Sequence, residues 1–241
     1  MKNKRTSSFL IYVPYWIGVL AGLYLTVVAA WADMEAAFYG FRRLADSGLR
    51  GFSCPVLMTR DETRSISLKV SNPLDVPLRP VVRAEISTSL LPEEFLEQLE
   101  LAPGETKRLE WTVGPENIDL ERFIFAKALV YSVYPLPNQE ATCGIFIVDL
   151  PGSGRTIFAF LVLLTLGGLG WGMYGMRRAD AADVWTERYN RPMMFLAVVV
   201  GMGVAVSAMG GWMPSILLLA VAVLTIVILL GAFVMRERRS E

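Results

Sequence analysis

Long apolar stretches without charged residues flank one central segment in which polar and apolar positions alternate. Four of these stretches reach bilayer length: 9–32, 156–176, 193–212 and 215–235. Because a helix rises about 1.5 Å per residue, about 20 residues cross a hydrocarbon core roughly 30 Å thick. The pattern therefore predicts four transmembrane helices, with one folded domain inserted between the first and the second.

Basic residues indicate the orientation of these helices. They precede the first stretch, lie between the second and third, and follow the fourth, and basic flanks usually stay in the cytoplasm. In chain order we predict a cytoplasmic N-terminus (1–8), a transmembrane helix (9–32), an extracytoplasmic domain (33–154), a second helix (155–176), a cytoplasmic loop (177–191), a third helix (192–212), a fourth helix (213–235) and a cytoplasmic C-terminus (236–241). The expected location is the plasma membrane of a prokaryote.

The end of the first stretch has two interpretations. Ala30-Trp31-Ala32 resembles a signal-peptidase site after a basic start. However, the apolar run from Phe9 is longer than the hydrophobic region of a signal peptide, which has about 7–15 residues. We expect an uncleaved anchor, and cleavage between Ala32 and Asp33 stays the alternative.

The composition agrees with a membrane protein. Hydrophobic residues make up 54% of the 241-residue chain and the mean hydropathy is +0.44, whereas about 45–50% apolar residues is usual in a soluble domain. Segment 32–155 has 18 acidic and 13 basic residues, so the net charge of zero combines an acidic outer domain with basic inner segments. Topology and anionic lipid headgroups explain the basic segments, so membrane lipid is an expected partner and nucleic acid is not.

Within the outer domain, alternation with a period of two predicts β-strands. The expected strands are 63–71, 79–87, 107–113, 122–134 and 141–150. Turn signals such as Asn72-Pro73 and Pro103-Gly104 separate them. Several short strands at regular spacing predict an all-β antiparallel sandwich.

Segment 92–99 breaks this pattern, and we expect it to be a short helix with Phe95 and Leu99 facing the sandwich. The carboxylates of this segment are Glu93, Glu94, Glu97 and Glu100. Carboxylates three and four residues apart are common on an exposed helix, so a solvated face is the favoured interpretation. A cation site or an acidic docking patch is the alternative.

Both cysteines, Cys54 and Cys143, lie in the outer domain and most simply form one disulfide. It would close a loop of about 90 residues, which the chain-entropy model values at roughly 4–5 kcal/mol. A metal site would need more ligands, and the chain has no histidine. A redox pair would more often be a close Cys-x-x-Cys motif. We therefore expect no metal and no cofactor.

A resemblance to known modules covers residues 63–133. The stretch TRSISLKVSNPLDVPLRPVVRAEIS, followed by LELAPGETKRLEWTV and then RFIFAKALVYSV, resembles the immunoglobulin-like adhesion and accessory modules of bacterial and archaeal surface proteins. In those modules a strand ending in xVxNP precedes a paired strand, and an L-x-PGE turn introduces the next. The resemblance implies an immunoglobulin-like sandwich that serves as a binding or structural module, and it names no family for the whole chain.

The four apolar stretches contain no Asp, Glu, Lys, Arg or His, which argues against ion or proton transport. They contain small residues four apart instead: Gly18 and Gly22 in the first helix, Gly168 and Gly172 in the second, and Ala197, Gly201 and Ala205 in the third, with Gly203, Ser207 and Gly211 as a further row there. Such rows let helix backbones approach closely. We expect them to pack the helices of this chain together or to dock on another membrane subunit.

These features favour a protein that is not an enzyme. The lack of histidine excludes Ser-His-Asp, Cys-His and histidine–metal sites, and no residue is identified as catalytic. The leading hypothesis is an accessory or scaffold subunit of a membrane protein complex, whose sandwich domain binds another protein. The alternative is a free-standing surface receptor or adhesion protein that binds an external ligand. A membrane enzyme or lipid transporter is less favoured, because the spans offer no polar groups to line a cavity.

Overall fold

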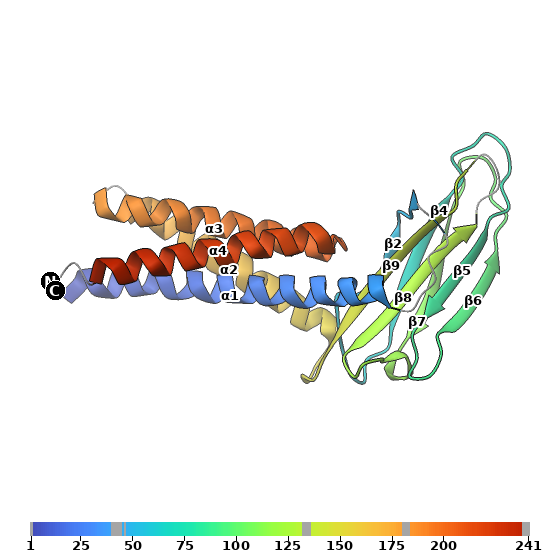
Figure 1. Cartoon of the computed structure of the whole chain (residues 1–241), viewed down its shortest axis with the longest axis horizontal. Helices are drawn as coiled ribbons and strands as arrows, with labels where there is room; N and C mark the ends of the chain where they lie inside the picture. The colour runs from blue at the N-terminus through green and yellow to red at the C-terminus, as the bar shows by residue number, and fades with distance from the viewer. Residues whose placement is uncertain (1, 40–44, 46, 132–135, 180–183, 238–241) are drawn as a thin grey trace. The chain divides into compact units, whose positions relative to one another are not determined.

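The computed structural model describes residues 2–39, 45, 47–131, 136–179 and 184–237 (Figure 1). Residues 132–134 of the strand expected at 122–134 lie outside the described residues, as do parts of the predicted cytoplasmic loop and C-terminus.

The chain divides into two compact units. One unit contains residues 1–30 and 158–241, and the other contains residues 31–157. The first unit is helical. The second contains the strands, together with the last turns of the first helix and the first turn of the second.

Four helices are long and apolar enough to span a membrane, as the hydropathy pattern predicts. They are α1 (Lys2–Phe38), α2 (Gly154–Ala179), α3 (Val184–Ala208) and α4 (Trp212–Glu237). Their candidate spans are Tyr12–Phe38, Gly154–Arg178, Asn190–Ala208 and Trp212–Ala232.

Several helix boundaries differ from the predicted ones: α1 already begins at Lys2, and α3 ends at Ala208, four residues before its predicted end. α1 also continues past the predicted end of the first membrane span at residue 32, through Asp33 and Glu35 to Phe38. α3 begins at Val184, inside the predicted cytoplasmic loop, and Pro192 therefore lies within the helix and not at its start. Hydropathy marks where the apolar stretch begins, whereas a helix continues through polar residues for as long as its backbone bonds are made.

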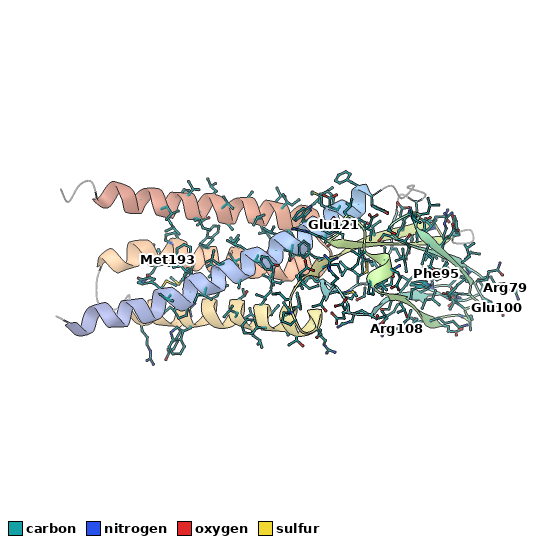
Figure 2. The ribbon with its side chains drawn as sticks, turned by 90° about the horizontal axis from the view of Figure 1, so that it is seen from below. Arg79, Phe95, Glu100, Arg108, Glu121 and Met193 are labelled. Carbon is teal, nitrogen blue, oxygen red and sulfur yellow. A yellow bond between two sulfur atoms is a disulfide. The ribbon has the colours of Figure 1, made fainter. Side chains whose placement is uncertain are left out.

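All four helices contribute to one apolar cluster in the helical unit. Tyr15 and Val19 of α1 are fully buried there. The Tyr15 hydroxyl donates a hydrogen bond of 2.7 Å to the carbonyl oxygen of Met193 in α3, which is labelled in Figure 2. α4 contributes Ala222 and Leu229, while much of its other apolar surface stays exposed. Exposed apolar surface on such a helix is suited to contact with lipid.

Two β-sheets form the second unit (Figure 1). The strands are β1 (Ser47–Gly48), β2 (Phe52–Ser53), β3 (Leu57–Thr59), β4 (Arg64–Ser71), β5 (Val81–Ile86), β6 (Glu93–Gln98), β7 (Thr106–Val113), β8 (Phe123–Tyr131) and β9 (Gln139–Val148). One sheet has the order β1-β9-β8-β5-β6, with β3 also pairing with β9, and the other has the order β2-β4-β7. β1 and β3 run parallel to β9, and the other pairings are antiparallel.

Alternation along the strands places one apolar face of each sheet in a shared core. Ile66 and Leu68 of β4 are fully buried, as are Val82 and Ile86 of β5. Residues of β7, β8 and β9 belong to the same cluster. Two sheets around one core make a β-sandwich-like fold, as the period-two pattern predicts. The two- and three-residue strands β1, β2 and β3 are too short for alternation to show, and the sequence does not predict them.

The other face of β8 and β9 receives the last turns of α1. The Trp31 ring lies 5.3 Å from the Phe123 ring of β8. The Asp33 carboxylate accepts the N–H of Gly144 in β9 at 3.0 Å. A side chain at Gly144 would collide with the Ala32 carbonyl group. α1 therefore continues beyond its apolar stretch because its last turns pack closely on the sheet.

Glu62, in the turn between β3 and β4, holds the start of α2. Its carboxylate accepts the N–H of Gly154 at 2.7 Å and the N–H of Thr59 at 3.1 Å, and it pairs with Arg64 at 3.3 Å. Burial alone would raise the pKa of the Glu62 carboxyl. The two hydrogen bonds and Arg64 together outweigh this effect, so the pKa lies below the ordinary 4.5. This carboxylate is thus a structural anchor.

A disulfide joins Cys54 to Cys143, with the Cα atoms 6.5 Å apart, which is the pairing that the sequence predicts. It links the segment between β2 and β3 to the middle of β9. Both side chains pack against the shared core.

Candidate protein-binding surface

The acidic segment 92–99 is not the helix that the sequence predicts. Residues Glu93–Gln98 form β6, antiparallel to β5. Phe95 and Leu99 do face the core. They are four residues apart, however, and this spacing places two side chains on one face of a helix or of a strand alike. Pairing with β5 makes this segment a strand, and the periodicity of the sequence gives no information about that pairing.

β6 is the edge of its sheet, because β5 is its only partner among the described strands. The Leu99 N–H donates to the Pro80 carbonyl at 3.0 Å. Backbone groups of an antiparallel strand point alternately toward and away from the partner. Glu94, Leu96 and Gln98 therefore direct their N–H and C=O groups away from β5, toward the open side of the sheet.

Three leucines of the β5–β6 hairpin (81–98) are exposed. Leu90 and Leu91, in the turn, are 90% and 78% exposed, and Leu96, in β6, is 64% exposed. Single exposed apolar residues are ordinary, but several within one hairpin indicate an interaction surface. The alternation pattern of the sequence does not identify these leucines. One feature of the sequence could have indicated them. Leu90 and Leu91 are adjacent apolar residues directly before Pro92, and this pair does not fit the alternation of a strand.

The turn that contains these leucines is held in place. The Thr88 hydroxyl donates to the Leu91 carbonyl at 2.5 Å and accepts the Leu90 N–H at 3.4 Å. At the base of the turn, the buried Ser87 hydroxyl donates to the Asn117 carbonyl at 2.8 Å, and the Asn117 side chain donates to the Ser87 carbonyl at 3.2 Å. The leucines thus project from an ordered turn, which lowers the entropy cost of binding.

Carboxylates lie on and just beyond β6, the strand that contains Leu96. Arg83 of β5 pairs with Glu94 at 3.0 Å, and Arg79 pairs with Glu100 at 2.9 Å, as Figure 2 shows for the latter pair. Glu93 and Glu97 form no ion pair with any residue that the structure describes. The edge therefore combines apolar side chains, outward-directed backbone groups and uncompensated negative charge.

Two of the predicted glycine rows pack α1 against α2. A side chain at Gly18 would lie 2.9 Å from the backbone nitrogen of Leu169, and one at Gly172 would lie 2.6 Å from Tyr15. Gly168 touches the backbone of α1 in the same way, and Gly22 packs against α2 and α3. These rows are used within the chain.

The predicted row in α3 behaves differently. Ala197 is buried in the helical cluster. Around Gly201, no described atom beyond its own stretch of helix lies within 4 Å of where a side chain would begin, and Ala205 is exposed. Gly201 and Ala205 therefore do not pack against another described helix of this chain, which leaves docking on another subunit as the alternative for this row. The neighbouring row is the buried one, with Gly203 against Thr26 of α1 and Ser207 3% exposed.

A cavity of about 260 Å³ lies at the end of the sandwich opposite the β5–β6 turn. Leu78, Leu101 and Val130 give it apolar walls, and Arg50 and Lys69 are its cationic lining residues.

Among the described residues, no group of three His, Cys, Asp or Glu side chains is arranged to hold a metal ion.

Comparisons with known proteins give no family. No family model matches the chain, and no curated protein matches it. A CARDB domain from Pyrococcus furiosus, solved in complex with di-metal ions, is 15% identical, covers 45% of this chain and 98% of its own, and has a TM-score of 0.32. A β-glucosidase from Erythrobacter marinus is 20% identical, with 41% and 15% of the two chains covered and a TM-score of 0.28. A Pseudomonas fluorescens alkylpurine DNA glycosylase, bound to DNA with an abasic site analog, is 10% identical, with 51% and 36% covered and a TM-score of 0.31. At these TM-scores the likeness carries no conclusion about fold or function.

Proposed function

We propose that this protein is a non-catalytic accessory or scaffold subunit of a membrane protein complex, located in a prokaryotic plasma membrane. Its immunoglobulin-like sandwich lies outside the cytoplasm and binds another protein, while both chain ends lie inside. Placement of basic residues supports this topology, and the four apolar helices support membrane anchoring.

The observation that carries the proposal is the ordered β5–β6 hairpin with Leu90, Leu91 and Leu96 exposed. Exposed apolar side chains on a folded domain cost free energy in water unless a partner covers them. Gly201 and Ala205 on the outward face of α3 would add a second contact, with a helix of the same complex.

Co-purification tests the proposal. The tagged full-length chain is extracted from its native membrane in a mild detergent and separated by size-exclusion chromatography. We expect a second protein to elute with it in a fixed ratio. A monodisperse chain with no associated protein, under conditions that preserve other membrane complexes, would contradict the proposal.

The cavity between Arg50 and Lys69 favours the second candidate, a surface receptor for an external ligand. Its apolar walls and two cations suit a small anion with an apolar part. Decanoate would then raise the melting temperature of the wild-type protein and leave that of an Arg50→Ala, Lys69→Ala variant unchanged. An equal shift in both proteins would exclude this site.

A further inference from the structure

We infer that the open edge of β6 binds an extended, basic segment of the partner protein, which adds to the sheet as a further strand. This inference rests on the proposed function and specifies the chemistry of the partner. Strand addition combines main-chain hydrogen bonds, which supply affinity, with alternate side chains, which supply specificity.

The backbone of β6 is suited to this role. The Leu99 bond to Pro80 fixes which residues pair with β5, and it leaves the N–H and C=O groups of Glu94, Leu96 and Gln98 on the open side. These three residues are exposed. An incoming strand would satisfy these groups without disturbing any bond to β5.

Charge selects the occupant. Glu93 and Glu97 form no ion pair with a described residue. The Glu94 carboxylate forms an ion pair with Arg83. A second copy of this chain would place carboxylates against carboxylates. This pairing is unfavourable, because directly opposed like charges in a sheet repel each other. A segment with lysine or arginine opposite Glu93 and Glu97 would meet opposite charges instead.

Leu96 and the turn leucines define the apolar part of the occupant. Leu96 and Glu94 point to the same face of β6, because they are two residues apart. The matching segment therefore has an apolar residue opposite Leu96 and a basic one opposite Glu94. Beyond the end of the strand, Leu90 and Leu91 extend the apolar contact.

A synthetic peptide tests the inference directly. The peptide is acetylated, has lysine opposite Glu93, Glu94 and Glu97 and leucine opposite Leu96, and is fluorescently labelled. Its binding to the full-length protein in lipid nanodiscs is measured by anisotropy, with empty nanodiscs as the blank and a peptide with glutamate in place of lysine as the control. We expect binding of the lysine peptide that weakens with salt, because the charges are exposed, and none of the glutamate peptide. No binding of the lysine peptide, or equal binding of both peptides, would overturn the inference.

A matched pair of variants separates strand addition from simple charge attraction. Gln98→Pro removes an outward N–H and no bond to β5, since proline is tolerated on the open side of an edge strand. Gln98→Ala removes the side chain alone. We expect the proline variant to bind the lysine peptide about tenfold more weakly than the alanine variant, the loss of about one hydrogen bond. Equal affinities would overturn strand addition.

Hydrogen exchange gives a test that needs no variant. In the wild-type protein, the amides of Leu96 and Gln98 should exchange fast when free and more slowly with the lysine peptide bound. Unchanged exchange at saturation would overturn the inference. The two proposals fail differently: a partner that co-purifies equally with Gln98→Pro and Gln98→Ala leaves the accessory function intact and excludes strand addition, whereas the absence of any partner removes the function itself.

Discussion

Each sheet of the sandwich has one long edge strand, β6 in one sheet and β7 in the other, and the two edges have different surfaces. On β7, Arg108 pairs with Glu110 at 2.7 Å, and nearby Lys107 pairs with Glu105 at 3.8 Å. Every residue of β7 is described, and none of its large apolar side chains is exposed. β6 instead exposes Leu96, and its Glu93 and Glu97 form no ion pair with a described residue.

This difference indicates which edge is protected and which is available. Charged side chains on an edge strand are a common means of keeping it from pairing with other chains. On β7 the charges of Arg108, which is labelled in Figure 2, and Glu110 compensate each other. β6 has charge of one sign only, and we propose that it therefore repels acidic strands and copies of itself and admits a basic strand.

The largest expected effect is on the anchor of the β5–β6 turn. Asn117→Ala removes the side chain that accepts the Gly114 N–H at 2.9 Å and donates to the Ser87 carbonyl, both buried. We expect a loss of about 2–4 kcal/mol in the free energy of unfolding, because buried polar groups lose their partners. Denaturant unfolding followed by near-UV circular dichroism measures it. Thr112→Ala on β7 is the control and should change stability by less than about 0.5 kcal/mol. Equal losses would contradict the assigned anchor.

The next effect separates the two edges by partner binding. Leu90→Ser with Leu91→Ser should reduce the co-purified partner about tenfold or more while stability stays the same, because both side chains are exposed and contribute to no core. Arg108→Ser with Glu110→Ser on β7 should leave partner recovery unchanged. Quantitative mass spectrometry of the purified complexes gives the ratio. A similar loss from both edges would remove the distinction between them.

Charge reversal should have a smaller effect. Glu93→Lys with Glu97→Lys reverses two β6 charges that form no ion pair with a described residue, and we expect partner affinity to fall about tenfold at low salt and less at high salt. Glu110→Lys on β7 serves as the matched reversal and should not alter affinity. Titration of the partner at two salt concentrations distinguishes these outcomes. An effect that does not depend on salt would argue against an electrostatic role for β6.

The smallest effect concerns acid stability, which neither edge controls. The pKa of Glu62 is lowered in the folded protein, so its stabilisation is fully present above the unfolded pKa of about 4.5 and is lost as the pH falls through the folded value. At pH 7, Glu62→Gln should cost about 1 kcal/mol. The stability difference between the wild type and this variant should shrink below about pH 4.5. A difference that stays constant from pH 7 to pH 3 would contradict the role of the carboxylate.

Periodicity identifies the long elements of the fold and fails at their boundaries. Alternation in β4, β5 and β7 reflects one buried and one solvated face, and the apolar stretches reflect a required length. The continuation of α1 to Phe38 depends on its contacts with β8 and β9, which lie far away in the sequence. Local hydropathy contains no such information.

The candidate surface is less predictable than the fold. The carboxylates of β6 are visible in the sequence, but the helical spacing of Phe95 and Leu99 hides the strand. Which backbone groups are open depends on the register with β5. Likewise, Gly201 and Gly203 are indistinguishable in the sequence as small residues, and only the packing of α3 shows that Gly203 faces α1.

Site-specific photocrosslinking in the native membrane tests the central claim most directly. A photoreactive amino acid replaces Leu91 in the β5–β6 turn or, in a second protein, Arg108 on β7. We expect a crosslink to one discrete protein from position 91, lost when Leu90 is also changed to serine, and no such product from position 108. Crosslinks to lipid alone from position 91, or the same product from both positions, would contradict it.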